Sequence, residues 1–175
     1  MAHKHAPEIS IVDRAKFYAI EKHKYVNQSY DIYPYSFHLD MVYKVAKRFI
    51  DLIPIQDRDE VLAGTWVHDI IEDARENYND VKREINEVVA EYAYALTNPK
   101  GKDREQRNSK GYYDGLKLYK HASFIKLCDR IANVEFSRKS GNSMYKKYQK
   151  EAKEFRTKLD DGRWDEMWKY LESKL

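Results

Sequence analysis

One imidazole and three carboxylates fall within six positions of an otherwise apolar, helix-like stretch. Residues 66–73 read Trp-Val-His-Asp-Ile-Ile-Glu-Asp, which places His68 beside Asp69 and puts Glu72 and Asp73 one turn later. Burying such groups on a core-facing helix is costly unless they are paired or coordinate a metal ion. The stretch therefore predicts a cation site, for which other parts of the chain must supply further ligands.

His38 and Asp129 are the best candidates for those ligands, because each lies near an apolar helical segment rather than in a polar tail. Plainer explanations stay open for both. His38 would also suit a surface or capping position at a helix start, and Asp129 would also suit a pairing with Lys126 or Asn133 on its own helix. The central motif favours the metal site, because a purely structural reading must explain several costly polar groups at once.

Hydrophobic spacing of three and four residues predicts helices along most of the chain, and no segment shows the sustained alternation of a strand. Ser36 is expected to be the N-cap of the second helix, and a capping box at Asp57 and Glu60 is expected to start the third. The predicted helices span residues 11–25, 36–50, 61–73, 79–96, 121–137, 142–159 and 164–171. The central motif lies on the third, so His68 and Glu72 would share one face.

Length and composition favour one helix-rich globular domain. The chain has 175 residues, of which 42% are apolar and 35% charged, with only 6 Gly and 4 Pro. We expect a single domain over residues 1–175, with the motif-bearing core at about 11–137 and C-terminal helices at 142–173. The formal charge of +3 is too small and too dispersed to indicate nucleic-acid binding.

The remaining composition predicts a cytoplasmic protein. Cys128 is the single cysteine, which excludes a disulfide framework and points to a reducing compartment. No apolar run approaches the roughly 20 residues that cross a bilayer, and the first residues lack the apolar core of a signal peptide. Neither a membrane nor a nucleic acid is expected as a partner.

A strongly polar segment separates the fourth and fifth predicted helices. Residues 100–111 contain no apolar side chain and five cations, so a surface loop or flexible lid is expected there. The net positive charge favours an anionic ligand, and Arg104 and Arg107 are the candidates to clamp its phosphates. The alternative is a solvated run of charges without a ligand.

The candidate ligands also match a known pattern. His38, His68, Asp69 and Asp129 follow in order the H…HD…D pattern of the HD-domain metal-dependent phosphohydrolases, a resemblance that covers roughly residues 11–136. Three longer segments are similar to motifs of the RelA/SpoT-type guanosine tetraphosphate, or (p)ppGpp, hydrolases. They are His-Asp-Ile-Ile-Glu-Asp at 68–73 (HDxxED), Pro-Tyr-Ser-Phe-His at 34–38 (PYxxH) and Lys-Leu-Cys-Asp-Arg-Ile-Ala-Asn at 126–133 (KLADRxxN).

This resemblance implies an all-α fold, a compact HD-domain helical bundle holding one divalent metal ion. The implied ligands of that ion are His38, His68, Asp69 and Asp129. The resemblance further implies that Glu72 and Asp73 handle the attacking water and that Asn133 contacts the substrate or supports the site. Two imidazoles and two carboxylates suit a borderline-to-hard ion, so Mn²⁺ is expected, with Zn²⁺, Fe²⁺ and Co²⁺ as alternatives.

The substrate implied is a small phosphorylated nucleotide, first of all the 3′-pyrophosphate of (p)ppGpp. In those hydrolases the link between the first two helices carries a basic segment near the guanine, whereas this chain lacks the expected Arg there. Lys24, Tyr25 or Asn27 would then contact the base, and Lys126 is a further candidate substrate contact. The alternatives are a (deoxy)nucleoside mono- or triphosphate phosphohydrolase and, in another class, a non-catalytic nucleotide-binding regulatory module.

Overall fold

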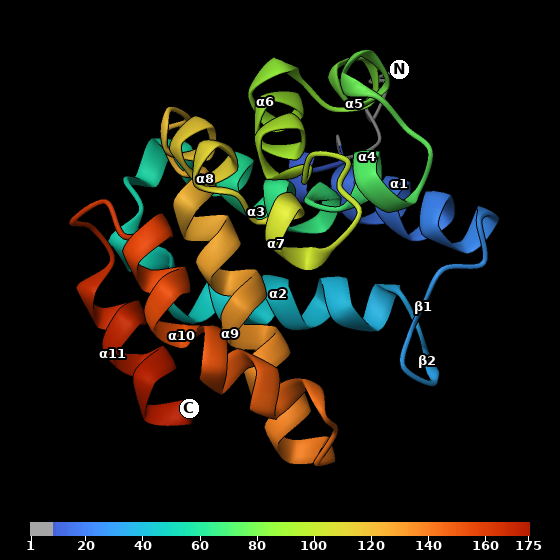
Figure 1. Ribbon diagram of the computed structural model, residues 1–175. Helices are drawn as coiled ribbons and strands as arrows, with labels where there is room; N and C mark the ends of the chain where they lie inside the picture. Colours follow the sequence, from blue (N-terminus) through green and yellow to red (C-terminus); the bar gives the residue numbers. More distant parts are fainter. Residues whose placement is uncertain (1–8) are drawn as a thin grey trace, which may run out of the picture.

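The computed structural model describes residues 9–175 and is built almost entirely from helices (Figure 1). The α-helices are α1 Ile11–Tyr25, α2 Ser36–Arg48, α3 Arg58–Val67, α4 Ile70–Asp73, α5 Tyr78–Glu84, α6 Glu87–Leu96, α7 Arg104–Arg107, α8 Lys110–Lys117, α9 Ala122–Ser140, α10 Met144–Leu159 and α11 Asp165–Lys174. Two short 3-10 helices, η1 Ile50–Leu52 and η2 Ile55–Asp57, join α2 to α3. The expected all-α fold is confirmed.

Helix α3 forms the centre of the fold. It packs against α1, α2 and α6, while α2 also packs along α9, so that α2, α3 and α9 meet in the middle of the molecule (Figure 1). Every residue from Val61 to Val67 is buried, which is the pattern of a helix covered on all sides. Gly64 permits the close approach, because a Cβ there would lie 2.8 Å from Ile125 Cδ1 and 3.0 Å from Tyr92 Cδ2.

The expectation of one continuous helix through the central motif is wrong. Helix α3 ends at Val67 and α4 begins at Ile70, and Asp69 between them has φ −108° and ψ 4°. The ring of His68 contributes to the break, since its Nδ1 lies 2.8 Å from the carbonyl oxygen of Thr65, one of the last carbonyls of α3. The motif therefore occupies a junction between two helices, where its side chains can leave in different directions.

The N-caps expected for α2 and α3 are also absent. Asp57 precedes α3 without a side-chain capping bond; its Oδ2 instead accepts hydrogen bonds from Lys120 Nζ at 2.7 Å and pairs with His121 Nε2 at 2.9 Å. Ser36 is the first residue of α2 rather than its cap, and the residue before it makes no capping bond. At Asp57, contacts with distant residues have taken over a side chain that the local pattern assigns to its own helix.

The link between α1 and α2 is a small antiparallel hairpin, with strands β1 Ser29–Tyr30 and β2 Tyr33–Pro34. The strands pair Tyr30 with Tyr33 across a two-residue turn. Asn27 and Asp31 have φ values of 53° and 55°, in the left-handed region that Asn and Asp tolerate better than most residues. This link places Tyr30 and Tyr35 against His38, near the amino end of α2.

Later segments differ less from expectation. The predicted helix over 79–96 is divided into α5 and α6, because Asn86 accepts a hydrogen bond from the N–H of Val89 and starts a new helix. Within the polar segment 100–111, Asp103 caps the short helix α7, so the segment is not a plain loop. Helices α10 and α11 pack on α9, and Met167, Trp168 and Leu171 are buried. Among residues 9–175, no helix is long and apolar enough to cross a membrane.

We expect Gly64→Ala to destabilise the protein by about 1–3 kcal/mol, because the new methyl group would overpack the contact of α3 with α6 and α9. Urea unfolding measures the change. Gly115→Ala is the matched control, since a Cβ there meets nothing within 4 Å, and this substitution in α8 should stabilise by about 0.5–1 kcal/mol. Equal effects of the two substitutions would contradict close packing at Gly64.

Candidate active site

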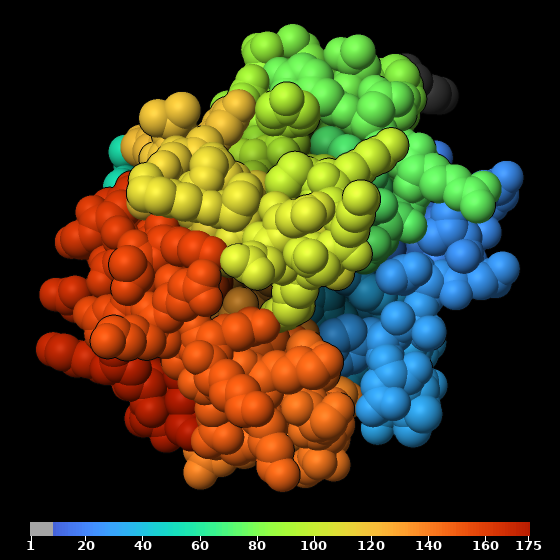
Figure 2. All heavy atoms as spheres, in the orientation of Figure 1, coloured from blue at the N-terminus to red at the C-terminus, as the bar shows by residue number. Residues whose placement is uncertain are grey.

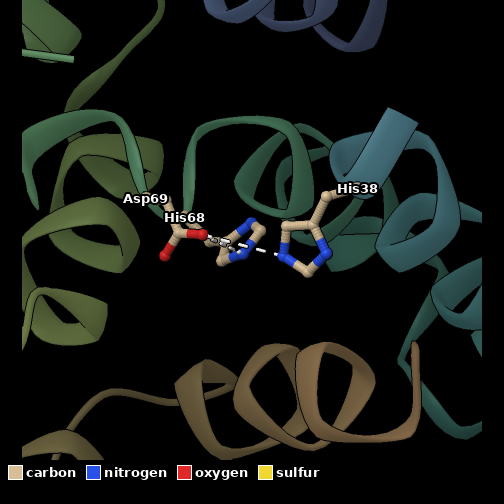
Figure 3. A group of neighbouring side chains, drawn as sticks. All are labelled: His38, His68 and Asp69. Carbon is tan, nitrogen blue, oxygen red and sulfur yellow. Dashed lines mark ion pairs between the residues drawn. The ribbon is translucent and has the colours of Figure 1, made fainter. Parts of the chain in front are cut away.

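Three of the four expected metal ligands lie together in the core. The donor atoms of His38, His68 and Asp69 are all within 4.8 Å of one another. Asp69 Oδ2 is 2.9 Å from His68 Nε2 and 3.7 Å from His38 Nε2, and both rings point toward this carboxylate (Figure 3). Both histidines are almost fully buried, at 2% and 1% exposure, which excludes a surface position for His38.

Asp129 of α9 closes the group from the other side. Its Oδ1 lies 3.3 Å from His38 Nε2 and 3.9 Å from His68 Nε2. The structural pairings considered from the sequence are present as well, since Lys126 Nζ lies 3.4 Å from Oδ2 and Asn133 Nδ2 donates to Oδ1 at 2.5 Å. Asp129 is therefore held by its own helix in an orientation that faces the two imidazoles.

The arrangement of His68 fits a metal ligand. A carbonyl oxygen only accepts, so the contact of His68 Nδ1 with Thr65 O places a proton on Nδ1 and makes Nε2 the nitrogen that can bind a cation once its own proton leaves. This Nε2 lies 2.9 Å from Asp69 Oδ2 and has no hydrogen-bond partner. Two ligand atoms at about 2.1 Å from one ion and at right angles would lie roughly 3 Å apart.

The charges of the group are strongly coupled. Burial lowers the pKa of His68, but Asp69 and Asp129 outweigh it and raise that pKa to about 9. Burial works against both carboxylates, yet the imidazoles and, for Asp129, first of all Lys126 keep their pKa values well below the usual range. The carboxylates are thus ionised at neutral pH, and a cation entering the site would displace a proton from His68.

Tyrosines hold the ligands in place. Tyr35 donates its hydroxyl to Asp69 Oδ2 at 2.5 Å, and burial raises the pKa of this hydroxyl so that it stays a donor. Tyr30 stacks on the ring of His38 with centroids 4.7 Å apart and donates to Asn133 Oδ1 at 2.7 Å. Asn133 is accordingly a link between Tyr30 and the Asp129 carboxylate. Such outer contacts orient metal ligands in proteins.

Helix α4 turns the second acidic pair of the motif toward the same site. Burial raises the pKa of Glu72, and so do the charges of Asp69 and Asp73. The N–H of Asn98, which donates to Glu72 Oε2 at 3.1 Å, acts in the opposite direction. Burial and Asp69 likewise raise the pKa of Asp73, whose Oδ2 accepts a hydrogen bond from Gln28 Nε2 at 3.4 Å. A carboxylate with a raised pKa is suited to accept a proton near neutral pH.

Apart from His68, the candidate metal ligands and the acidic pair line one cavity of about 230 Å³. The expected substrate contacts Arg104, Arg107, Lys126 and Asn133 line it. Lys24 and Tyr25 do not; both are exposed at the end of α1, Tyr25 by 80%, because the chain turns away there into the hairpin.

Six further lining residues were not expected from the sequence: Tyr30, Tyr35, Asn98, Asn108, Arg130 and Tyr148. Two of them lie inside the motifs, since Tyr35 belongs to the Pro-Tyr-Ser-Phe-His segment and Arg130 follows Asp129 directly. These two could have been found by asking what else each motif places on the face of its ligand. The others come from the hairpin, the segments around α7 and helix α10, and carry no comparable signal.

Comparison with known proteins supports the fold. No family model matches the sequence, and neither does any curated protein. Among solved structures, the chain is similar to a metazoan ortholog of SpoT, described as hydrolysing ppGpp and playing a role in starvation responses. The match has a TM-score of 0.75 at 20% sequence identity and covers 97% of this chain and 96% of that one.

This likeness extends over nearly the whole length of both chains, and at 20% identity it is a likeness of fold. The resemblance to the RelA/SpoT-type hydrolases that the motifs indicate is thus confirmed for the arrangement of the helices. The chain has the fold of a ppGpp hydrolase. Its own chemistry has to be inferred from the residues of the cavity.

One buried histidine behind the site makes the stability sensitive to acid. His23 is 1% exposed, stacks on Tyr35 at 4.5 Å, and has no hydrogen-bond partner on either nitrogen. Burial lowers its pKa from 6.5 to about 4. The unfolded chain therefore binds a proton more readily than the folded one, so this contribution is complete above about pH 6.5 and is lost as the pH falls toward about 4.

We expect acidification through this window to cost up to about 3 kcal/mol of unfolding free energy through His23 alone. His23→Phe should flatten the pH dependence by that amount, because the ring and its stacking on Tyr35 remain while the titration is removed. Urea unfolding at several pH values between 4 and 7 measures the difference between the two chains. Parallel curves for both would show that His23 is not the titrating group.

Proposed function

We propose that this protein is a metal-dependent phosphohydrolase of a phosphorylated nucleotide, with the 3′-pyrophosphate of (p)ppGpp as the first substrate to test. One observation carries the proposal, namely the convergence of two imidazoles and two carboxylates beside a second acidic pair, with all of these groups except His68 lining one cavity. The groups are His38, His68, Asp69 and Asp129, with Glu72 and Asp73. The likeness of fold to a ppGpp hydrolase supports the same reading.

The proposed cofactor is one divalent ion held by His38, His68, Asp69 and Asp129. The mixed nitrogen and oxygen donors favour Mn²⁺, with Zn²⁺, Fe²⁺ and Co²⁺ as alternatives. Such an ion supplies Lewis acidity, which lowers the pKa of water and polarises a phosphoryl oxygen. Tyr35 and Asn133 keep the two carboxylates turned toward the imidazoles, so the donor set is formed before any ion enters.

Glu72 and Asp73 are the proposed proton acceptors. They lie one turn beyond the histidine and aspartate of the motif, and their raised pKa values suit the removal of a proton from the attacking water. Lys126 is 13% exposed and its pKa is raised by Tyr112 and Asp129 despite burial, so it keeps its charge. That charge, together with Arg107, is available to phosphate oxygens in the cavity.

The charge of the cavity fits an anionic substrate. Its walls hold the carboxylates Asp69, Glu72, Asp73 and Asp129 and the cations Arg104, Arg107, Lys126 and Arg130. Four negative and four positive groups line the cavity, and Glu151 pairs with Arg104 and Arg130, so a bound divalent ion would leave the site with an excess of about one positive charge. A phosphorylated ligand restores the balance, whereas a neutral one does not.

A neighbouring cavity favours a nucleotide over an inorganic polyphosphate. It has a volume of about 300 Å³ and shares Tyr30, Asn133 and Tyr148 with the 230 Å³ cavity at the candidate metal ligands, here called the metal cavity. Phe136 and Met144 also line it. Aromatic faces of this kind stack on nucleobases. A base placed here does not need the basic segment that the α1–α2 link lacks.

The second candidate is a (deoxy)nucleoside mono- or triphosphate phosphohydrolase. The positions of Lys24 and Tyr25 favour it, because the residues that would replace the missing guanine-side Arg do not reach the cavity. It uses the same metal ligands and the same acidic pair. The products distinguish the two candidates.

With Mn²⁺ present, we expect the protein to release pyrophosphate from guanosine tetraphosphate. Chelation should stop turnover, and saturation with Mn²⁺ at 100 times its Kd should stabilise the fold by about 2.7 kcal/mol. Product analysis and thermal unfolding are the measurements. Release of orthophosphate or triphosphate from other nucleotides would favour the second candidate, and tight binding of nucleotides without any turnover would favour a regulatory module.

Two substitutions separate metal binding from proton transfer. Asp69→Ala should lose both metal and activity, whereas Glu72→Gln should keep the metal and lower kcat by about 100-fold or more. Metal analysis and steady-state kinetics report the two properties. Glu84→Gln, a charge change on exposed α5, is the control. Full metal occupancy in Asp69→Ala would contradict the assigned ligand set.

A further inference from the structure

We propose that Arg104 and Arg130 form a second anion subsite, which binds the phosphate groups of the nucleotide that are not cleaved, and that Glu151 occupies this subsite when no nucleotide is bound. The inference rests on the proposed function, because it assumes that one phosphoryl group of the same ligand lies at the metal ligands. It names the substrate class as a nucleotide phosphorylated at two separate positions.

The subsite is built by three separate elements. Arg104 of α7 donates to both oxygens of Glu151 on α10, from Nε at 2.6 Å and from Nη2 at 2.9 Å. Arg130 of α9 donates from Nη1 to Glu151 Oε2 at 3.2 Å. Figure 2 shows the yellow-green segment around α7 lying against the orange surface of α10. A single carboxylate thus holds two guanidinium groups that the chain brings together from distant positions.

Both arginines stand at the boundary of two cavities. They line the cavity at the candidate metal ligands and also a third cavity, of about 410 Å³. Asn108 is shared by the two cavities as well, and its carbonyl oxygen accepts a hydrogen bond from Lys158 Nζ at 2.9 Å. A ligand with one phosphoryl group at the metal ligands can therefore reach the arginine pair without leaving the connected space.

The guanidinium of Arg130 is held in position before a ligand arrives. Its side chain is 10% exposed, and its Cζ lies 4.0 Å from the ring centroid of Phe155 and 4.8 Å from that of Tyr148. Such stacking fixes the planar group and limits its hydration, which strengthens its attraction to an anion. Arg104 lies over the same Tyr148 ring at 5.9 Å. The guanidinium groups of Arg104 and Arg130 therefore both lie over the ring of Tyr148.

A phosphate group suits this pair better than the carboxylate of Glu151 does. Two guanidinium forks offer more donors than two carboxylate oxygens can accept, and one of the two positive charges stays uncompensated by Glu151. A phosphate with three oxygens and a charge near −2 matches both forks. Glu151 is then a competitor that the incoming phosphate displaces, and it lowers the affinity for ligands that cannot reach both sites.

The test compares two nucleotides in the Glu72→Gln background, where hydrolysis is slow, with Mn²⁺ present. The probes are guanosine carrying diphosphates at both the 5′ and 3′ positions and guanosine carrying the 3′-diphosphate alone, measured by calorimetry. We expect the 5′-diphosphate to raise the affinity about 10-fold or more. Adding Arg130→Met should reduce this gain to about 2-fold, and adding Glu151→Gln should enlarge it about 3-fold or more, because the competitor is removed.

Controls remove the same charges elsewhere. Arg83→Gln on α5 and Glu166→Gln on α11 are exposed and lie outside the three cavities, so they should leave the ratio of the two affinities unchanged. If Arg130 and Glu151 only fasten α10 to α9 and α7, their substitution should change the affinity for both nucleotides equally. That result, equal affinity of the parent chain for the two nucleotides, or binding of neither would overturn the subsite.

The proposed function fails differently. If the chain with Glu72 intact releases no pyrophosphate while the affinity ratios behave as expected, hydrolysis is rejected and the subsite remains. If pyrophosphate is released but the ratios do not respond to Arg130→Met, the subsite is rejected and hydrolysis remains.

Discussion

Electrostatic repulsion between two buried carboxylates is the constraint on which the rest of the structure depends. Asp69 lies at the junction of α3 and α4 and Asp129 on α9, and both face the same pair of imidazoles. Each needs nearby positive charge or hydrogen-bond donors to stay ionised in the core. Tyr35 and His68 provide this stabilisation for Asp69, and Lys126 and Asn133 provide it for Asp129. The hairpin, the break after α3 and the polar face of α9 are all placed so that these supports can reach.

The break after α3 follows from the same constraint. On one uninterrupted helix, His68 and Asp69 would point about 100° apart and could not both face His38 at close range. Ending α3 at Val67 places their donor atoms 2.9 Å apart, while α4 turns Glu72 and Asp73 into the cavity. The sequence pattern predicts which residues meet, but the apolar periodicity across the motif continues through the junction and so conceals it.

Features that depend on local sequence were predictable, whereas contacts between distant residues were not. The bounds of α1 and the meeting of His38, His68 and Asp69 were predictable, because helical periodicity is local and the cost of buried charge applies wherever such residues occur. Asp57 was not, since its carboxylate contacts Lys120 and His121 rather than capping its own helix. Its partners lie more than 60 positions away, and spacing within one helix carries no information about them.

The proposed function would separate the recognition of phosphate from its cleavage within this cavity. The metal ligands and the acidic pair occupy one wall, whereas Arg104, Arg107 and Arg130 come from α7 and α9 on the side that adjoins α10. Lys126 lies beside the candidate ligands, tied to Asp129 at 3.4 Å, where its charge would compete with an ion for that carboxylate. Glu151 takes up part of the charge of Arg104 and Arg130. In the proposed subsite a more highly charged anion would replace Glu151, and selection among nucleotides would then depend on how many phosphate groups reach this second wall, and less on the base.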